Sequence, residues 1–195
     1  MSDEIRASNM TTDTFKLTIH MVSSVDGFIA KHDNSVSWFE TSDTYERGVV
    51  GEDPEQFLKT IDCFVMGYRT YEHALELSQA YGWAYGDVPT IVITHRNLQP
   101  YKKNIGFYSG DLKKFVDERL KPNYKNVWVV GGAMLVKDFI QLKLADEIRL
   151  SVLPIILGEG KLFFDQIGQE HVLHLNNVTA YKSGMVELSY VIRKE

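Results

Sequence analysis

The fold of this chain is decided by the stretch Asn126-Val127-Trp128-Val129-Val130-Gly131-Gly132-Ala133-Met134. Its apolar, β-branched first part is typical of a strand buried on both faces, in the middle of a parallel sheet. The two glycines end that strand, and a helical pattern begins at Ala133. Because glycine lacks a Cβ and a helix start presents unpaired N–H groups, the junction suits a bound phosphate. For the stretch alone, a Gly-Gly pair that merely ends a strand is an equally good interpretation.

Short apolar runs alternate with amphipathic segments on both sides of this stretch. The apolar runs predict strands over residues 15–21, 63–66, 90–94, 105–108 and 147–153. The amphipathic segments predict a helix that starts at Asp53 and helices over 70–79, 111–120 and 133–141. Such alternation is typical of right-handed crossovers onto a mostly parallel sheet. Residues 172–181 and 185–193 flank a turn and predict an antiparallel C-terminal hairpin, so we expect an α/β fold with a mixed sheet.

Length and composition indicate one ordinary globular domain. The chain has 195 residues, a formal net charge of −5 and a sequence pI near 5.7. This charge, together with the absence of a lysine and arginine run, argues against a nucleic-acid partner. No apolar stretch is long enough to span a bilayer, so we expect no membrane partner. The polar residues 1–14 predict a flexible tail, and residues 15–195 the domain.

The cysteine and histidine content limits the chemistry further. Cys63 is the only cysteine of the sequence, so it forms no intrachain disulfide, and we expect a cytoplasmic protein. The histidines show no ligand spacing with one another or with acidic residues, so we expect no metal site.

Four predicted strands end in residues that suit a bound ligand. In open α/β sheets, ligands bind at the carboxyl ends of the strands. There the sequence places Ser24 and Asp26, the run from Gly67 to Thr70, the run from Thr94 to Arg96, and the run from Gly131 to Ala133. Three of these ends combine features that suit phosphate groups, and several phosphate sites on one edge suit a dinucleotide. A Gly-x-Gly-x-x-Gly fingerprint is missing.

Four motifs carry a resemblance to a known family. They are Ser23-Ser24-Val25-Asp26-Gly27-Phe28-Ile29-Ala30, Val65-Met66-Gly67-Tyr68-Arg69-Thr70-Tyr71-Glu72, Val129-Val130-Gly131-Gly132 and the run from Ala145 to Gly160. With these motifs the chain resembles the dihydrofolate-reductase-like family, and within it the stand-alone relatives of the reductase domain of the bacterial riboflavin-biosynthesis deaminase-reductase. The resemblance implies a mixed sheet of about eight strands flanked by helices, NADPH as cofactor, and a homodimer. It also implies hydride transfer to a pteridine- or pyrimidine-like small molecule, of which 5-amino-6-(5-phosphoribosylamino)uracil is one example.

Matched position by position, the resemblance implies a cofactor site. Ile29 and Ala30 would lie against the nicotinamide. Gly67, Tyr68, Arg69 and Thr70 would hold phosphates, and Thr94, His95 and Arg96 would line the adenosine end. Gly131 and Gly132, which could be joined by a cis peptide as in dihydrofolate reductases, would pass beneath the cofactor, with Ala133 and Met134 at the helix start.

The resemblance also suggests a proton donor. Reduction of a C=N bond needs a proton near the hydride acceptor, and dihydrofolate reductases use a carboxylate on the helix after their long loop. Asp53 or Glu55 occupies about that place. Both residues also have structural explanations, because Asp53 suits the N-cap and Glu55 the first turn of a helix. Proton delivery from water, without a dedicated acid, stays open.

The residues expected at the substrate are Ser24, Asp26, Trp38 and Ser151. Asp26 has a structural alternative, since Asp-Gly favours a turn. Trp38 and its neighbour Phe39 would close over a planar ring or fill the core, and Ser151 would reach the pocket or point outward.

Two other classes of function stay open. A nucleotide-binding module would keep the cofactor site without turnover. A self-associating structural or regulatory protein would use the apolar C-terminal strands as its interface.

Overall fold

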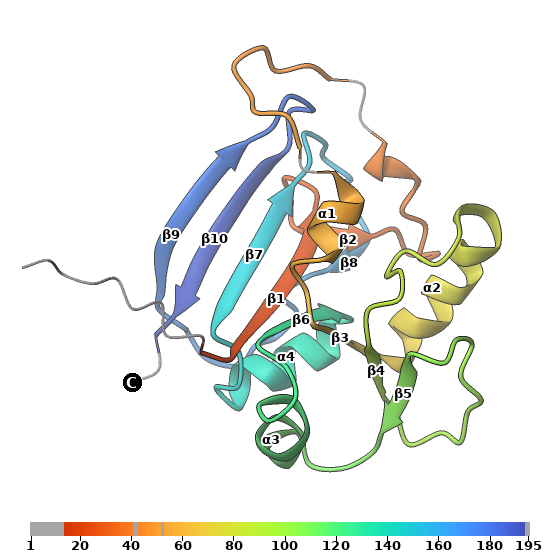
Figure 1. Ribbon diagram of the computed structural model, residues 1–195. Helices are drawn as coiled ribbons and strands as arrows, with labels where there is room; N and C mark the ends of the chain where they lie inside the picture. The colour runs from red at the N-terminus through yellow and green to blue at the C-terminus, as the bar shows by residue number, and fades with distance from the viewer. Residues whose placement is uncertain (1–13, 41–42, 52, 194–195) are drawn as a thin grey trace, which may run out of the picture.

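An eight-stranded sheet forms the centre of the computed structural model, which describes residues 14–40, 43–51 and 53–193 (Figure 1). In the order β5-β4-β3-β6-β1-β7-β10-β9, the strands from β5 to β7 run parallel, and β10 pairs antiparallel with both β7 and β9. The strands are β1 (Lys16–Ser23), β3 (Cys63–Gly67), β4 (Thr90–Ile93), β5 (Ile105–Tyr108), β6 (Asn126–Gly131), β7 (Glu147–Val152), β9 (Leu173–Ala180) and β10 (Val186–Ile192). This arrangement confirms the predicted α/β fold with a mixed sheet and an antiparallel C-terminal hairpin.

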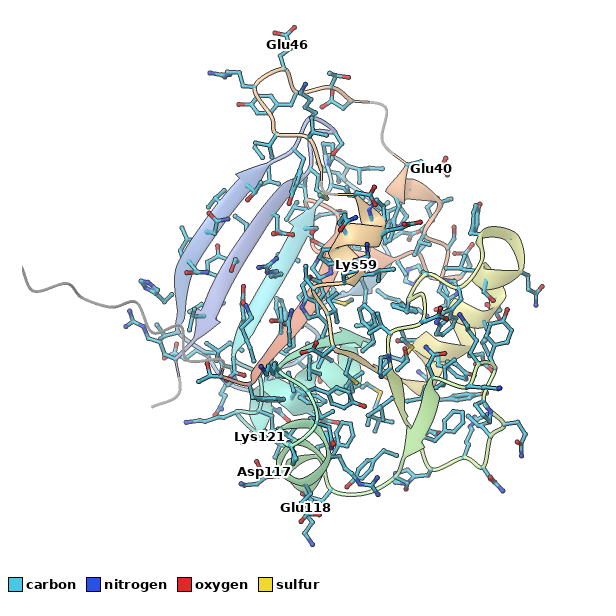
Figure 2. All side chains as sticks on the ribbon, viewed as in Figure 1. Glu40, Glu46, Lys59, Asp117, Glu118 and Lys121 are labelled. Atoms are coloured by element: carbon cyan, nitrogen blue, oxygen red, sulfur yellow. The ribbon has the colours of Figure 1, made fainter. Side chains whose placement is uncertain are left out.

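The helices follow the predicted pattern, apart from the bounds of α2, the division of the helix over 111–120, and the short turn η1, which was not predicted. They are α1 (Pro54–Leu58), α2 (Tyr68–Tyr81), α3 (Leu112–Lys114), the π-helical η2 (Phe115–Leu120) and α4 (Ala133–Gln141), with a short 3-10 turn η1 (Ser37–Phe39). Helix α2 begins two residues earlier than predicted, because Gly67 both ends β3 and serves as the N-cap of α2. The predicted single helix over 111–120 is α3 followed directly by η2, in which Asp117 and Glu118 point outward (Figure 2).

Aspartate side chains cap two helix starts, of which the sequence predicted the one at Asp53. The Asp53 side chain accepts a hydrogen bond of 2.8 Å from the N–H of Glu55 at the start of α1, where Pro54 is the first helical residue. Asp111 accepts one of 2.8 Å from the N–H of Lys114 in α3. These bonds satisfy amide groups that the first turn of a helix leaves without partners.

The two faces of the sheet have separate cores, because alternate residues of a strand point to opposite faces. On one face, Leu17 and Ile19 of β1 and Val129 of β6 pack against α3, η2 and α4. On the other face, Phe64 of β3 and Trp128 of β6 belong to a second core, to which α1 and α2 contribute. In Figure 1, α1 and α2 lie over the half of the sheet from β1 to β5, whereas no described helix crosses in front of β7, β10 and β9.

The connection between β1 and α1 is anchored at two places. Near its start, β2 (Phe28–Ala30) pairs antiparallel with β8 (Lys161–Leu162), a two-residue strand that the sequence did not predict. Farther along, residues 43–51 reach over the β9–β10 hairpin (Figure 1). There the N–H of Val49 donates to the carbonyl of Ala180 at 2.9 Å, and the N–H of Lys182 donates to that of Val49 at 2.8 Å. A Cβ on Gly48 would lie 2.4 Å from the carbonyl carbon of Tyr181, so the two segments touch backbone to backbone.

Two further properties concern the described residues only. None of their helices is long and apolar enough to cross a membrane. Within the same residues, no group of three or more His, Cys, Asp and Glu side chains is arranged to hold a metal ion.

Candidate functional site

A cavity of about 790 Å³ opens on the face of the sheet that carries α1 and α2. This volume is in the range of small-molecule sites, which hold roughly 300–1,000 Å³. Its walls come from β1, β2, β3, β6, α1, α2, the start of α4 and the segment after β2. Nine of the residues expected at the cofactor line it, and they are Ile29, Ala30, Gly67, Tyr68, Arg69, Thr70, Gly132, Ala133 and Met134.

One end of the cavity is built from backbone, and we call it the glycine end. It comprises Gly67, Tyr68, Arg69, Thr70, Gly132 and Ala133. The carboxyl ends of β3 and β6 meet here, since a Cβ on Gly67 would lie 3.7 Å from the carbonyl oxygen of Gly131. Gly67 and Gly132 are the N-caps of α2 and α4, so two helix starts converge on one place. Unpaired N–H groups and the positive ends of two helix dipoles favour an anion there.

Gly131 gives this end its backbone shape. Its φ of 124° lies in a region that favours glycine, and its peptide bond to Gly132 is cis. A Cβ at Gly131 would lie 3.3 Å from the Sδ of Met21, and one at Gly132 would lie 3.3 Å from the Oγ1 of Thr70. The absence of both Cβ atoms therefore leaves the backbone open to a ligand.

The segment after β4 contacts the glycine end through the ring of Tyr68. The guanidinium of Arg96 lies 4.1 Å from the centre of the Tyr68 ring, which is the geometry of a cation–π contact. The Arg96 N–H donates to the Oγ1 of Thr94 at 3.1 Å, and Nδ1 of His95 lies 2.7 Å from the Oγ of Ser109. Thr94, His95 and Arg96 do not line the cavity themselves, but Arg96 covers a residue that does.

The opposite end is built from side chains, and we call it the aromatic end. It comprises His20, Phe57, Leu58, Phe64, Tyr85 and Trp128. Phe64 lies three residues before Gly67 on β3, and Trp128 lies three residues before Gly131 on β6, which separates the two ends by about 10 Å.

The rings of the aromatic end contact one another. The centre of the Trp128 ring lies 4.6 Å from that of His20 and 5.0 Å from that of Phe57, the second pair edge to face. The Phe64 and Tyr85 rings lie 4.9 Å apart, also edge to face. Such edge-to-face pairs hold each other in place, so the walls of this end are preformed for a flat ligand.

The two titratable side chains of the aromatic end are neutral near pH 7. Burial, reinforced by the positive charge of Arg149, lowers the pKa of His20 from 6.5 to about 4. Burial raises the pKa of Tyr85 to about 12. The Nε2 atom of His20 lies 3.1 Å from the Oγ of Ser151, a buried residue of β7. Ser151 therefore reaches the cavity only through His20.

A charged network on β7 and β10 borders the aromatic end. Its centre is the buried carboxylate of Glu147, which forms an ion pair with Lys16 and accepts bonds from the Oγ of Ser189 at 2.5 Å and the Nε of Arg149 at 3.1 Å. Burial raises the pKa of Glu147, but these partners outweigh it and lower the pKa overall. Arg149 also lies 3.7 Å from Glu187, so its charge faces two carboxylates.

All four residues expected at the substrate lie outside the cavity lining. The Asp26 carboxylate accepts bonds from the hydroxyl of Ser24 at 2.6 Å and from the N–H groups of Leu157 and Gly158 at 3.1 and 2.7 Å. This pair therefore fastens the turn after β1 to the segment after β7. Trp38 is buried, and its ring meets Phe39 edge to face at 4.7 Å, so Phe39 rather than Trp38 reaches the cavity.

The expected proton donors are also outside the lining. Asp53 is exposed and caps α1, and Glu55 is exposed in the first turn of that helix. The same helix instead contributes Phe57 and Leu58.

None of the residues of the aromatic end was predicted from the sequence as a site residue. One signal was available for His20, because the alternation of Leu17, Ile19 and Met21 places it on the opposite face of β1. The same alternation places Trp128 on the opposite face of β6 from Val127 and Val129. No local pattern predicts that these residues meet Phe57 and Tyr85, which come from distant parts of the chain.

Comparisons with known proteins agree with this architecture. Residues 15–187 match the family described as the RibD C-terminal domain. The chain is 30% identical over 176 residues to YwjB, an uncharacterized protein of Bacillus subtilis (strain 168), which covers 90% of this chain and 97% of that protein.

Two solved structures have the same fold. A provisionally assigned riboflavin biosynthesis protein from Shewanella sp. PV-4 superimposes with a TM-score of 0.77 at 17% identity, covering 92% of this chain and 100% of that chain. Dihydrofolate reductase from Enterococcus faecalis, complexed with NADP(H) and RAB-propyl, gives a TM-score of 0.57 at 16% identity, covering 92% and 97%. The fold is therefore that of the dihydrofolate reductases.

Proposed function

We propose that this chain, which belongs to the RibD C-terminal domain family, is an NADPH-dependent reductase of a pteridine- or pyrimidine-like small molecule. The proposal starts from the family, because it is a family of reductase domains. The observation that carries the proposal is one continuous cavity that joins the glycine end to the aromatic end. A nucleotide with a reactive ring needs an anion site and a flat site side by side, and the cavity supplies both.

The residues of the glycine end fit a dinucleotide cofactor. The paired helix starts at Gly67 and Gly132 suit its pyrophosphate, with the hydroxyl of Thr70 and the charge of Arg69 beside them. The Arg96–Tyr68 pair suits the adenosine end. Ile29 and Ala30 line the cavity where the nicotinamide would lie. When bound, NADPH supplies the hydride. The dihydrofolate reductase of similar fold was solved with NADP(H), which supports the choice of cofactor.

The protein's own residues would orient the substrate and exclude water. Phe57, Phe64 and Trp128 would hold the ring flat, and Phe39 would cover it from the loop. His20, fixed by Ser151, offers a neutral hydrogen-bonding group beside the ring. Because Asp53 and Glu55 lie outside the cavity lining, we infer that the proton comes from water that reaches the cavity.

Cofactor binding is tested by titrating NADPH in a calorimeter. Thr70→Val removes a hydroxyl at the glycine end without changing the side-chain shape, and we expect affinity for NADPH to fall about fivefold, as for one lost hydrogen bond. Ser78→Ala is the control, because Ser78 lies on the same helix and bonds the carbonyl of Leu75. Equal affinity of both variants and the wild type, or no binding of NADPH, would contradict the proposal.

Cofactor choice is tested by comparing NADPH with NADH. Arg96→Ala removes a positive charge that covers Tyr68, and we expect the preference for NADPH to fall while affinity for NADH changes little. Lys103→Ala is the control, because it also removes one positive charge but lies on the segment before β5, outside the lining of this cavity. An unchanged preference in Arg96→Ala would remove this residue from the site.

A binding module without turnover is the second candidate. It is favoured by the placement of Asp53 and Glu55, because the aromatic end contains no described carboxylate. The two candidates are separated by absorbance at the NADPH band. A reductase oxidises NADPH when dihydropterin- or aminouracil-type compounds are present, whereas a binding module binds NADPH and leaves it unchanged.

Self-association is compatible with either candidate. The edge strand β9 exposes Leu175 and Val178 at 50% and 52% of their surfaces. A homodimer therefore stays a prediction, and light scattering of the wild type and of Val178→Lys would test it.

A further inference from the structure

We infer that the aromatic end of the cavity takes a flat, uncharged heteroaromatic ring that carries no phosphate group. This inference rests on the proposed reductase function, and it narrows the substrate class. The family resemblance includes a phosphoribosyl pyrimidine among the implied substrates, so the inference separates this chain from that example.

The walls of the aromatic end favour a flat ring. The Trp128 ring is held between His20 at 4.6 Å and Phe57 at 5.0 Å, and the Phe64 and Tyr85 rings meet at 4.9 Å. Phe57 is additionally carried on a helix whose start is fixed by the Asp53 cap. Burial of a planar apolar surface against fixed rings requires little reordering of side chains.

The charged side chains of the lining lie elsewhere. Among the described lining residues they are Arg69, Asp138 and Lys161. Arg69 is in the first turn of α2 at the glycine end, and Asp138 is on α4. Lys161 lies on β8, which pairs with the nicotinamide-side strand β2, and its Nζ bonds the side chain of Asn34. The internal residues outside the description, Thr41, Ser42 and Glu52, carry no positive charge.

The aromatic end therefore offers no charge partner to a phosphate. Its titratable groups, His20 and Tyr85, are neutral near pH 7. The guanidinium of Arg149 lies 5.6 Å from the centre of the Trp128 ring, but Arg149 does not line the cavity and its charge already faces Glu147 and Glu187. A phosphate moved into this end would lose its hydration without an ion pair to replace it, which is unfavourable.

One neutral group remains to recognise a heteroatom of the ring. The Nε2 of His20 is engaged by Ser151, and no described residue bonds its Nδ1. A neutral imidazole nitrogen can donate or accept one hydrogen bond to a ring nitrogen or carbonyl. This matches an uncharged pteridine or pyrimidine edge.

The test compares two matched pairs of ligands, and the members of each pair differ only in phosphorylation. One pair is 6-hydroxymethyl-7,8-dihydropterin and its pyrophosphate ester, and the other is 5-amino-6-ribosylaminouracil and its 5′-phosphate. Affinities are measured by calorimetry on the full chain saturated with NADP⁺. We expect the phosphate-free member of at least one pair to bind about tenfold or more tightly than its partner.

A variant adds the missing charge. Leu58→Lys places an ammonium on a flexible stem at the wall of the aromatic end, and Leu58→Met is the uncharged control of similar size. We expect Leu58→Lys to improve the relative affinity of the phosphorylated member about tenfold, and Leu58→Met to leave the ratio within about twofold. Thermal denaturation checks that both variants fold.

The outcomes separate this inference from the proposed function. Equal or tighter binding of the phosphorylated members to the wild type overturns the inference, and so does failure of all four ligands to bind while NADPH binds. Failure of NADPH to bind, while the phosphate-free rings bind the chain without cofactor, overturns the proposed function and leaves only the preference of the aromatic end for phosphate-free rings standing.

Discussion

The two ends of the cavity are built by different means. The glycine end is made of backbone, where the ends of β3 and β6 and the starts of α2 and α4 fix every N–H group. The aromatic end is made of side chains from β1, α1, β3, β6 and the segment after α2. A backbone site depends on the fold and recognises groups common to many ligands, such as phosphates. A side-chain site changes with single substitutions, so it is the aromatic end that sets the substrate.

The largest expected effect comes from a substitution that disrupts the glycine end and leaves the aromatic end intact. Gly131→Val forces a β-branched residue to a φ of 124° and places a Cβ 3.3 Å from the Sδ of Met21. The strain amounts to about 1–3 kcal/mol, and the lost backbone shape should weaken NADPH binding roughly hundredfold. Calorimetry measures the affinity. Gly106→Ala on β5 is the control, because a Cβ there meets nothing within 4 Å. Wild-type affinity in Gly131→Val would show that this backbone does not shape the site.

The second effect tests the neutrality of the aromatic end. The folded pKa of His20, about 4, is below the ordinary 6.5, so between these values the unfolded chain binds the proton first. Its contribution to stability is therefore complete above about pH 6.5 and is lost as the pH falls toward 4, by at most about 3 kcal/mol. We expect denaturant unfolding to show this loss in the wild type and not in His20→Gln. The control is His174→Gln on the exposed edge strand β9, which should retain the loss.

The third effect breaks the aromatic end alone. Trp128→Leu removes the ring that contacts both His20 and Phe57, and affinity for a flat ring ligand should fall roughly tenfold. NADPH affinity should stay within about twofold, because the glycine end keeps its backbone. Phe107→Leu is the control, since Phe107 belongs to the same core and contacts Tyr71 but does not line the cavity. A similar loss of ring affinity in Phe107→Leu would mean that the effect is general destabilisation.

The smallest expected effect concerns the hydrogen bond between Ser151 and His20 at the aromatic end. Ser151→Ala removes the hydrogen bond that holds Nε2 of His20, and ring affinity should fall about threefold to tenfold. Nitrogen chemical shifts of the imidazole should change in this variant, which a purely structural role of Ser151 would not produce. Ser189→Ala, which removes a different buried hydroxyl bonded to Glu147, should leave those shifts in place.

The same contrast explains what the sequence could predict. The glycine end occupies contiguous stretches, so Gly67 to Thr70 and Gly131 to Ala133 are visible as strand-to-helix junctions in the sequence alone. The parallel order of the strands then brings those junctions together. The aromatic end has no contiguous motif, because its members are single residues on separate elements. Their meeting depends on strand register, such as that of Thr18 with Trp128, and register is a tertiary property.

Smaller features were missed for related reasons. The strand β8 has two residues, and only its pairing with β2 defines it. Ser24 and Asp26 follow β1 as predicted, but they form hydrogen bonds with each other and with Gly158. The local turn pattern of Asp26 and Gly27 does not predict the contact with Gly158. The sequence allows Asp53 to be either a proton donor or a helix N-cap, and in the structure its side chain forms the hydrogen bond of an N-cap. Its catalytic role stays a prediction.

The backbone contact between Gly48 and Tyr181 has a consequence for natural and laboratory variation. Because a Cβ at position 48 would lie within 2.5 Å of three backbone atoms, substitution there would push the loop away from the hairpin. Its neighbours Val49 and Val50 are exposed at 52% and 73% of their surfaces and face no such limit. In a library that randomises positions 48 to 50 and selects for folded protein, the first position should remain glycine, while the other two should accept varied side chains, except proline at position 49, whose N–H bonds Ala180.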